Sequence, residues 1–459
     1  MFLTSHVGAW NWWPLPMAEP DEQQDTLLYV GQMTALTSTN SFAPTLLQSN
    51  TYGEISSAAH SGNLSLGIIK PATRPHRWFD YNGAIILSGR LQSDHVRGTG
   101  YFSQLYAHLR LYIVDITVGI QPFYYGCAAA DLTMGDLLFS TNTHPIPQLR
   151  IGLDRWTPLP GFFGYVVIKG GLTHGWLDDN NPYVSNTLLH HAFIGGRIGG
   201  AFPVAISYEF HHAAQWGGKS AMYGDLGTSW SDFWQVFCAN KGGSIRNEIK
   251  NVLGNHIAFQ QVCLTAQGKK WYINAYWQAI NEDKPVRFIG FGMNPADGLW
   301  GLHMHQTAWP FLHSVTMEFI QTTDQSGPWH DRDGFVYGCR DDYYANSIYR
   351  QGWTYFGRTI GSPVLSPSNN RVMAGYIGIK GDIYVFTYRL AAQHTRNFGR
   401  YTAPVNNRNT SLLLDVHKHV EQAWGMDFGL SLGVDFGSQY GTQFGALFTI
   451  RKQGLIKTF

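Results

Sequence analysis

The regular alternation of apolar with polar or small residues at the C-terminal end constrains the fold more than any other feature. Every second residue from Met426 to Phe436 is apolar, and aspartate, glycine and serine occupy the positions between them. A turn-like segment follows at 437–441, and the alternation resumes from Phe444 to Ile450. A period of two is that of a β-strand, so these residues predict an antiparallel hairpin with one apolar face.

The length of these two segments indicates which kind of sheet they belong to. A water-soluble sandwich would show the same alternation, with its apolar face against a protein core. Soluble strands are usually ~5–6 residues long, whereas a strand that crosses a membrane at a tilt of ~45° needs ~9–11 residues. We therefore predict that this segment is the closing hairpin of a transmembrane β-barrel.

The overall composition is consistent with this prediction. The net charge of +1 gives no electrostatic reason to expect a nucleic acid or an acidic partner. Charged residues make up 14% of the chain, against ~25% in an ordinary soluble domain. Aromatic residues reach 15% and glycine occurs 51 times. Membrane barrels need aromatic residues at both interfaces, but carbohydrate-binding proteins are also rich in aromatics, so composition fits both.

The sequence argues against a helical membrane protein and against a zinc or redox motif. The mean hydropathy of −0.17 and the lack of an apolar run long enough for a helix exclude a helical membrane protein. The four cysteines lack CxxC spacing, which argues against a zinc or redox motif. A Cys238–Cys263 disulfide and free thiols in strands both remain open. The opening Met1–Pro20 does not resemble a signal peptide. Either an export segment has been trimmed from the sequence, or its start is misassigned, or the chain stays inside, and a membrane barrel requires one of the first two.

Strand patterns recur along the chain, and helix patterns are scarce. Alternating segments begin at Val204, Trp271 and Val315. The apolar phase switches within 104–121 and again at 380–382, which predicts tight hairpins. We expect long connections at Thr141–Pro160, Gly175–Asn186, Ala213–Ser231, Pro285–Pro310, Asp324–Gly352 and Ser362–Asn370.

These patterns predict an all-β fold, an antiparallel up-and-down transmembrane barrel. At roughly 25 residues per strand with its share of loop, the chain provides about 18 strands, with long extracellular loops and short periplasmic turns. We expect residues 1–26 to be an irregular lead-in and residues 27–459 to form the barrel in the outer membrane.

Several segments resemble one known family. They are 154–161 (DRWTPLPG), 169–177 (KGGLTHGWL), 317–323 (MEFIQTT) and 349–361 (YRQGWTYFGRTIG). In this order they are similar to the Wzi-type capsule assembly family, in the version found among Bacteroidetes. The similarity runs from about Leu27 to the C-terminus. None of these segments is a chemical motif, so the resemblance rests on their order.

The resemblance implies an outer-membrane barrel of about 18 strands that acts as a lectin and holds capsular or extracellular polysaccharide at the cell surface. It implies no catalysis. Its implied partners are the polysaccharide, outer-membrane lipid and the polysaccharide export machinery. Enterobacterial members carry a helical bundle at the periplasmic mouth, and no matching stretch is visible in this sequence.

Candidate carbohydrate contacts concentrate in the segment 324–352. Sugars are bound by stacking on aromatic rings and by hydrogen bonds from charged groups, and this segment offers both. The alternative without a ligand is a solvated loop with interfacial aromatics, and cation binding by its aspartates is a further option. The candidates are Trp329, His330, Asp331 and Asp333, a second patch of Trp300, His303 and Trp309, and Trp353, Tyr355 and Arg358 of the family-like segment.

Metal and catalytic sites are weakly supported. His303 and His305 would share one face of a strand, but no third ligand can be named. Glu318 with Asp331 or Asp333 would suit a glycosidase pair, although such pairs arise by chance in loop-rich proteins. We predict no catalytic residues, no metal and no cofactor.

The alternation also places charged residues in the lumen. Asp427, Asp435, Arg451, Glu209 and Arg389 should face inward, where buried ions must be paired or hydrated. A network from wall to wall would plug the barrel, as suits a surface lectin, whereas an open lumen would suit a porin. The two alternative functions are therefore a porin or channel and a secreted all-β enzyme acting on glycans.

Overall fold

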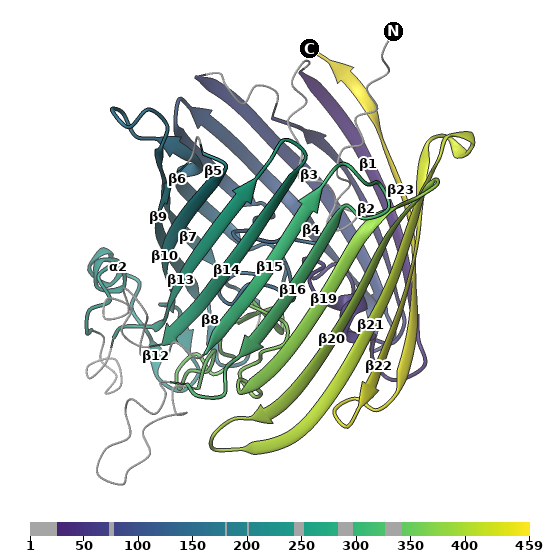
Figure 1. The fold of residues 1–459 in the computed structure, drawn as a ribbon. Helices are drawn as coiled ribbons and strands as arrows, with labels where there is room; N and C mark the ends of the chain where they lie inside the picture. Colours follow the sequence, from purple (N-terminus) through teal and green to yellow (C-terminus); the bar gives the residue numbers. More distant parts are fainter. Residues whose placement is uncertain are drawn as a thin grey trace.

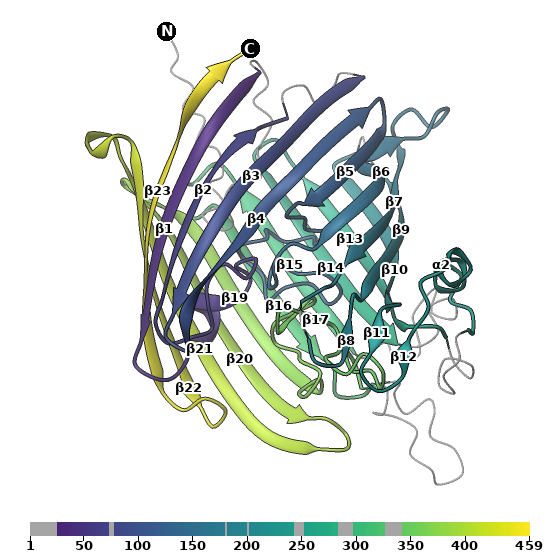
Figure 2. The same cartoon turned by 180° about the vertical axis from the view of Figure 1, so that it is seen from behind.

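In a computed structural model, the chain forms a closed antiparallel β-barrel whose wall contains 18 strands (Figures 1 and 2). The structure describes residues 25–72, 78–179, 181–199, 202–242, 252–282, 297–325 and 342–459. Each wall strand pairs with the strands before and after it in the chain, and β1 pairs with β23 to close the barrel. The predicted fold class and strand number are thus confirmed.

The wall strands in chain order are β1 (Thr26–Ser38), β2 (Ser61–Lys70), β3 (Phe79–Gln92), β4 (His95–Leu111), β5 (Val114–Ile120), β6 (Pro147–Pro158), β7 (Val166–Trp176), β9 (Leu188–Ile198), β10 (Val204–Trp216), β13 (Asn255–Gln267), β14 (Trp271–Glu282), β15 (Gly298–Gln306), β16 (Ser314–Gln321), β19 (Val372–Ile383), β20 (Phe386–Gly399), β21 (Pro404–Val420), β22 (Met426–Gly437) and β23 (Gln443–Thr458). The connections hold α1 (Thr45–Gln48), α2 (Trp230–Phe237), the 3-10 helix η3 (Glu421–Ala423) and the short strands β8 (Val184–Ser185), β11 (Lys219–Ser220), β12 (Gly224–Asp225), β17 (Thr354–Tyr355) and β18 (Arg358–Thr359).

The two ends of the barrel differ in the length of their connections. The first and last described residues, Asp25 and Phe459, lie at one end, which we call the turn end, where tight turns such as 112–113 and 384–385 join the strands (Figure 1). The opposite end, which we call the loop end, carries the long connections 39–60, 121–146, 217–254 and 322–371. In outer-membrane barrels the short turns are periplasmic and the long loops are extracellular.

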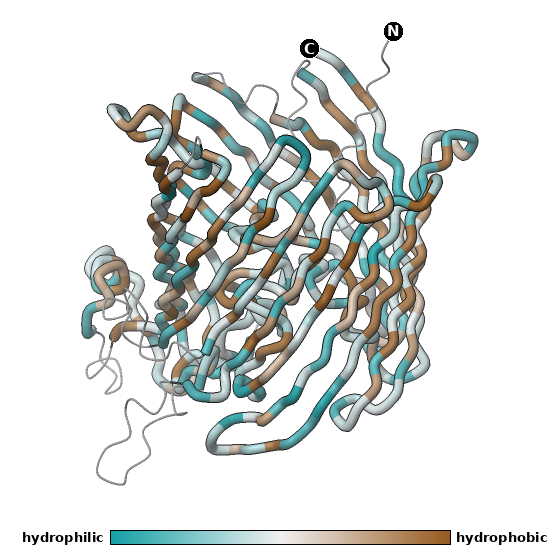
Figure 3. The backbone as a smooth tube through the Cα atoms, in the orientation of Figure 1, coloured by the Kyte–Doolittle hydropathy of each residue, from teal (hydrophilic) through white to brown (hydrophobic). Residues whose placement is uncertain are grey.

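Burial follows the predicted alternation. In β22 and β23 the outward Leu430, Phe436 and Phe448 are 46%, 43% and 42% exposed, whereas the inward Asp435 and Arg451 are 0% and 1% exposed. Brown and teal residues alternate along the wall strands in the same way (Figure 3). A wall with an apolar outside and a polar inside is the arrangement that lipid demands, and it confirms the predicted closing hairpin.

The first of the two predicted hairpins lies where expected, and the second is displaced. The turn between β4 and β5 is at Tyr112 and Ile113, with Tyr112 in the left-handed region at φ 57°. The turn expected at 380–382 instead occurs at Tyr384 and Val385. Lys380 and Asp382 remain paired within the β19–β20 ladder. These two residues are polar because they face the lumen. In the sequence, such polar residues resemble those of a turn.

Two of the expected long connections contain wall strands. The range 141–160 includes β6, and 285–310 includes β15, both of which have interrupted apolar patterns. The first half of β6 is regular, but its pairing with β7 shifts between Leu153 and Thr157. This irregularity removes the clean alternation on which strand recognition depends.

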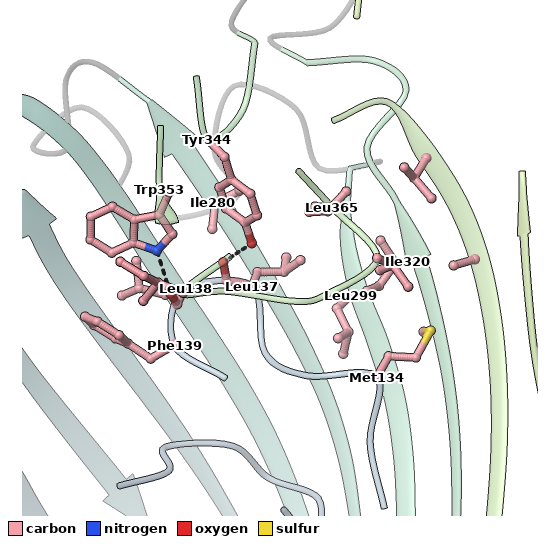
Figure 4. Close-up of a cluster of buried hydrophobic side chains, with 14 of the residues drawn as sticks. Met134, Leu137, Leu138, Phe139, Ile280, Leu299, Ile320, Tyr344, Trp353 and Leu365 are labelled. Atoms are coloured by element: carbon pink, nitrogen blue, oxygen red, sulfur yellow. Dashed lines mark hydrogen bonds between the residues drawn. The ribbon is translucent and has the colours of Figure 1, made fainter. Parts of the chain in front are cut away.

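The main hydrophobic core lies inside the barrel. Three loop-end connections, 39–60, 121–146 and 322–371, turn inward and pack on the wall, and we call the described parts of these segments the plug (Figure 2). The plug contributes Leu47, Met134, Leu137, Leu138 and Trp353 to one buried cluster with wall residues (Figure 4). Of the two alternatives that the sequence left open, the structure has the plugged lumen, and the plug is built mainly from loops.

Helices are few and short in the described ranges. None of the helices there is long and apolar enough to cross a membrane. The two α-helices belong to loop-end connections, so the described residues form no helical bundle at the turn end. Cys238 and Cys263 are free thiols, because Cys238 is exposed at the end of α2 and Cys263 is buried on β13.

A charge placed on the outer wall tests the membrane assignment. Leu430→Arg should destabilise the barrel in phosphatidylcholine vesicles by about 2–4 kcal/mol, because a guanidinium near the bilayer midplane loses its hydration. Urea unfolding monitored by tryptophan fluorescence measures this cost. The matched control is Thr402→Arg in the exposed loop-end turn between β20 and β21, which should cost about 1 kcal/mol or less. Equal costs at the two positions would contradict a lipid-facing Leu430.

Candidate functional site

The plug is held to the wall by inward-facing polar side chains. Glu318 of β16 accepts hydrogen bonds from Thr133 Oγ1 at 2.7 Å and from the Met134 amide at 2.5 Å. Gln278 of β14 accepts from the Leu137 amide at 3.2 Å and donates to Asp136 at 2.5 Å. Buried carboxylates and amides are stable only when their hydrogen bonds are satisfied, so these contacts fix the position of 133–137.

Charged side chains of the wall also bind the plug. Asp131 binds Lys380 Nζ at 2.7 Å, and its carbonyl accepts from Arg389 at 2.6 Å. Burial raises the pKa of Asp131, but the two cations more than offset this and hold that pKa below its usual value. At the other side of the plug, Asp435 of β22 accepts from the amide and hydroxyl of Thr45, both at 2.8 Å. The helix α1 is thus fixed against β22.

The predicted lumen charges are inward, but their pairing is local. Glu209 binds Lys169 at 2.7 Å on a nearby strand, and Arg389 binds Asp415 at 3.1 Å on the adjacent strand. Together with Asp435, they pair with neighbouring strands or with the plug. The expected network running directly from wall to wall does not form among the described residues, because the plug occupies the space between opposite walls.

A cavity of about 700 Å³ opens at the loop end, and we call it the mouth pocket. Five separate parts of the chain line it: the β1–β2 connection, the β3–β4 turn, the β5–β6 connection, the β16–β19 connection and the β22–β23 hairpin. Its lining includes Phe42, Gln48, Asn142, Gln351, Arg358, Tyr440 and Gln443. This mixture of amides, one guanidinium and two aromatic rings is the kind of surface that binds polyhydroxylated ligands.

Aromatic rings form one side of the mouth pocket. Phe42 and Tyr440 meet edge to face, with ring centroids 6.0 Å apart, and are 41% and 38% exposed. Hydrogen bonds from Ser38 to the Phe444 carbonyl and from Asn40 to the Thr442 carbonyl join the two segments that carry them. The rings are therefore held in place while one side of each remains open to a ligand.

Arg358 is the arginine in the lining of the mouth pocket. Its guanidinium donates to the Gln48 carbonyl at 2.9 Å and to the Ile55 carbonyl at 2.6 Å, which ties β18 to the α1 segment. Burial and the nearby Arg90 lower the pKa of Arg358 to about 10. The side chain is still positive at neutral pH, so it gives the pocket a fixed charge.

Apart from the second patch, the predicted contact residues fall into three groups. Trp329, His330, Asp331 and Asp333 lie outside the described residues. Arg358 lines the mouth pocket. Trp353 and Tyr355 are 0% and 4% exposed within the plug core, and the Trp353 indole donates to the Leu138 carbonyl at 2.8 Å. Their burial explains the aromatic character of this segment through packing.

The structure does not bring the second predicted patch together. Trp300 is exposed on the outer wall, whereas His303 is buried on the inward face of the same strand and bonds Thr316 at 2.8 Å. Trp309 is exposed at the turn end, stacked near Phe311. Residues 300 and 303 have opposite parity on a strand, so they cannot share a face. Phe42 and Tyr440 were not predicted, because neither has another aromatic residue beside it in the sequence.

The residues considered for a catalytic pair or a metal site make structural hydrogen bonds instead. Both oxygens of Glu318 bind the plug, and Tyr276 donates to it at 2.6 Å. His303 and His305 each bond a hydroxyl of β16. In the ranges that the structure describes, no cluster of three histidine, cysteine or acidic side chains is arranged to hold a metal.

The closed apolar-faced wall, its asymmetric ends and its inward loops define a plugged outer-membrane β-barrel. The model of the capsule assembly protein Wzi family matches residues 49–434, and the chain belongs to that family. The barrel resides in the outer membrane. Comparison with curated protein sequences finds no match.

Among solved structures, the Wzi barrel shares this fold. Wzi of Escherichia coli, described as a carbohydrate-binding β-barrel involved in group 1 capsule assembly, is 15% identical with a TM-score of 0.57 over 92% of this chain and 84% of its own. OccD3 (OpdP) of Pseudomonas aeruginosa is 9% identical with a TM-score of 0.49, over 96% and 95% of the two chains. At these identities the likeness to Wzi shows the fold alone.

Buried acids in the plug predict that stability depends on pH. Burial raises the pKa of Asp136 to about 8, and the Glu318 carboxylate adds to this rise. Because the folded pKa of Asp136 lies above its unfolded value, the contribution of this group to stability should be greatest at acid pH and should be lost as pH rises through about 8. Asp136→Asn keeps an acceptor for Gln278 and should raise the melting temperature at pH 9 by several degrees, with little change at pH 5.

Thermal unfolding in detergent, followed by tryptophan fluorescence at both pH values, measures this effect. Asp178→Asn, at an exposed carboxylate in the β7–β9 connection, is the control and should have no effect at either pH. Some pH dependence should persist in Asp136→Asn, because burial also raises the pKa of Glu54 to about 8. A variant that follows the wild-type profile would contradict an uncharged Asp136.

Proposed function

We propose that this protein binds capsular or extracellular polysaccharide at the mouth pocket and holds it at the cell surface without catalysis. Family membership supports a role in capsule assembly. The pocket lies at the loop end, which is the extracellular end of an outer-membrane barrel. Its size suits a few sugar residues, and its position at the rim lets a long polymer enter and leave.

The observation that carries the proposal is that the Phe42–Tyr440 pair and Arg358 line one cavity. Sugar rings stack on aromatic faces, and their hydroxyl groups exchange hydrogen bonds with amides such as Gln48 and Gln443, which line the same cavity. The charge on Arg358 is fixed by the α1 segment. The pocket is therefore preorganised, so binding immobilises few side chains.

Removal of the aromatic pair tests the proposal. Phe42→Ala and Tyr440→Ala should each weaken binding of the native capsule by roughly tenfold, since loss of one stacking ring costs on the order of 1–2 kcal/mol. Surface plasmon resonance with purified protein measures the affinity. Retention of capsule by cells that carry each variant provides the second readout.

The matched control is Tyr384→Ala, because Tyr384 is 98% exposed at the turn end, far from the mouth pocket. All variants should keep heat-modifiable migration on gels, which reports an intact closed barrel. Unchanged capsule binding in both pocket variants would overturn the assignment of the pocket. Absence of binding to any capsular glycan would overturn the proposed function.

The filled lumen favours this function over a channel. The plug packs against the wall from α1 to the β16–β19 connection. In planar bilayers the purified protein should show no stable single-channel current, whereas a porin of comparable strand number conducts readily. A steady current in the wild type would favour the channel alternative.

Two further expectations remain predictions. The proposal involves no enzyme activity, since Glu318 serves as a plug contact in the described structure. Contact with the polysaccharide export machinery is expected from the family resemblance. Co-purification of export components with the tagged barrel would test that expectation.

A further inference from the structure

Three histidines occupy positions on the outer wall that would otherwise face lipid. His190, His212 and His256 lie on the adjacent strands β9, β10 and β13, near their loop ends. They share parity with the outward residues Ile194, Ile206 and Leu264, which are 67%, 50% and 48% exposed. Yet the histidines are only 0%, 8% and 1% exposed. Something outside the barrel covers them.

The cover is the segment that contains α2. In both views α2 lies outside the wall beside the loop end of β10 (Figures 1 and 2). The rings of Phe233 and Phe237 lie 5.9 Å and 5.5 Å from the His190 ring. Val236 and Leu253 form a buried cluster with Ala214 and Trp216 of β10. The connection thus folds back over polar wall residues and shields them.

Only part of the apolar surface of α2 is used in this contact. At 100° per residue, Val236, Phe233, Phe237, Trp230 and Trp234 fall on one continuous arc of roughly 160°. The Val236 and Phe233 side faces the wall. Trp230 is 72% exposed, Trp234 47% and Phe237 37%. The polar residues Ser231, Asp232 and Gln235 occupy the rest of the helix.

The exposed half of this arc continues the lipid-facing surface of the barrel. His190 and Ile194 are four positions apart on β9, which is about 13 Å along the strand. The aromatic arc therefore borders the apolar belt on its loop-end side. Tryptophan-rich amphipathic helices rest at the boundary between headgroups and acyl chains, where the rings meet both environments.

We infer that α2 is a membrane-interface anchor, whose Trp230, Trp234 and Phe237 insert into the headgroup–acyl boundary of the outer leaflet. The anchor rests on the wall through Phe233 and Val236, and its Ser229–Asp232 capping box holds its first turn in place. It positions the connection between β10 and β13 at the membrane surface. This inference is independent of what the mouth pocket binds.

Site-directed spin labelling tests the anchor. The variants Trp234→Cys, on the aromatic arc, and Ser231→Cys, on the polar arc, are made in a Cys238→Ser, Cys339→Ser background, and Cys127 and Cys263 are left in place. The labelled protein is reconstituted in dimyristoylphosphatidylcholine vesicles. Collision rates with oxygen, which concentrates in lipid, and with a water-soluble nickel chelate are measured by power saturation.

We expect the ratio of oxygen to nickel collisions to be several-fold higher at position 234 than at position 231. Equal ratios would overturn the anchor, because position 234 would then face water. Low collision rates with both reagents at position 234 would also overturn it, because protein would cover the arc. Spin–spin broadening that disappears on dilution with unlabelled protein would identify that cover as a second copy.

Heat-modifiable migration establishes that each labelled variant has closed its barrel. Should Trp234→Cys fail to fold, Trp230→Cys probes the same arc with the same expected ratio. A low ratio at 230 in a folded barrel would overturn the inference equally.

Discussion

Closure of the wall between β1 and β23 is the constraint on which the rest of the structure depends. Lipid offers no hydrogen bonds, so each peptide group of the wall must find its partner in a neighbouring strand. The β1–β23 ladder runs from Thr26 against Thr458 to Ser38 against Gly445, and it leaves no open edge. Once the wall is closed, its two faces meet solvents of opposite character, and the alternation of side chains follows.

The filled lumen is the second consequence of closure. An 18-stranded ring encloses more space than its own inward side chains fill. In this protein three connections enter that space, and contacts such as those of Glu318 and Asp435 fix them there. The contacts join residues far apart in the chain, so the interior is organised only when the whole wall is in place. The mouth pocket is the part of this interior that stays open to the outside.

The sequence was sufficient to predict the wall and insufficient to predict the site. Strands with uninterrupted alternation, such as β22, could be recognised because one face meets lipid along their full length. In β6, a shift in pairing hides the period. Inward polar residues such as Lys380 resemble turn residues, since both are hydrophilic. The mouth pocket could not be found because its rings, Phe42 and Tyr440, are distant in the chain and are brought together by closure.

The assembly of the mouth pocket from five connections has a consequence for how its proposed ligand preference could change. Each lining segment is joined to the wall at its own hairpin or loop. Exchange of one segment would therefore alter a single side of the pocket and leave strand pairing untouched. A lineage that meets a new surface polymer could adapt by replacing one connection at a time, with the same membrane scaffold retained throughout.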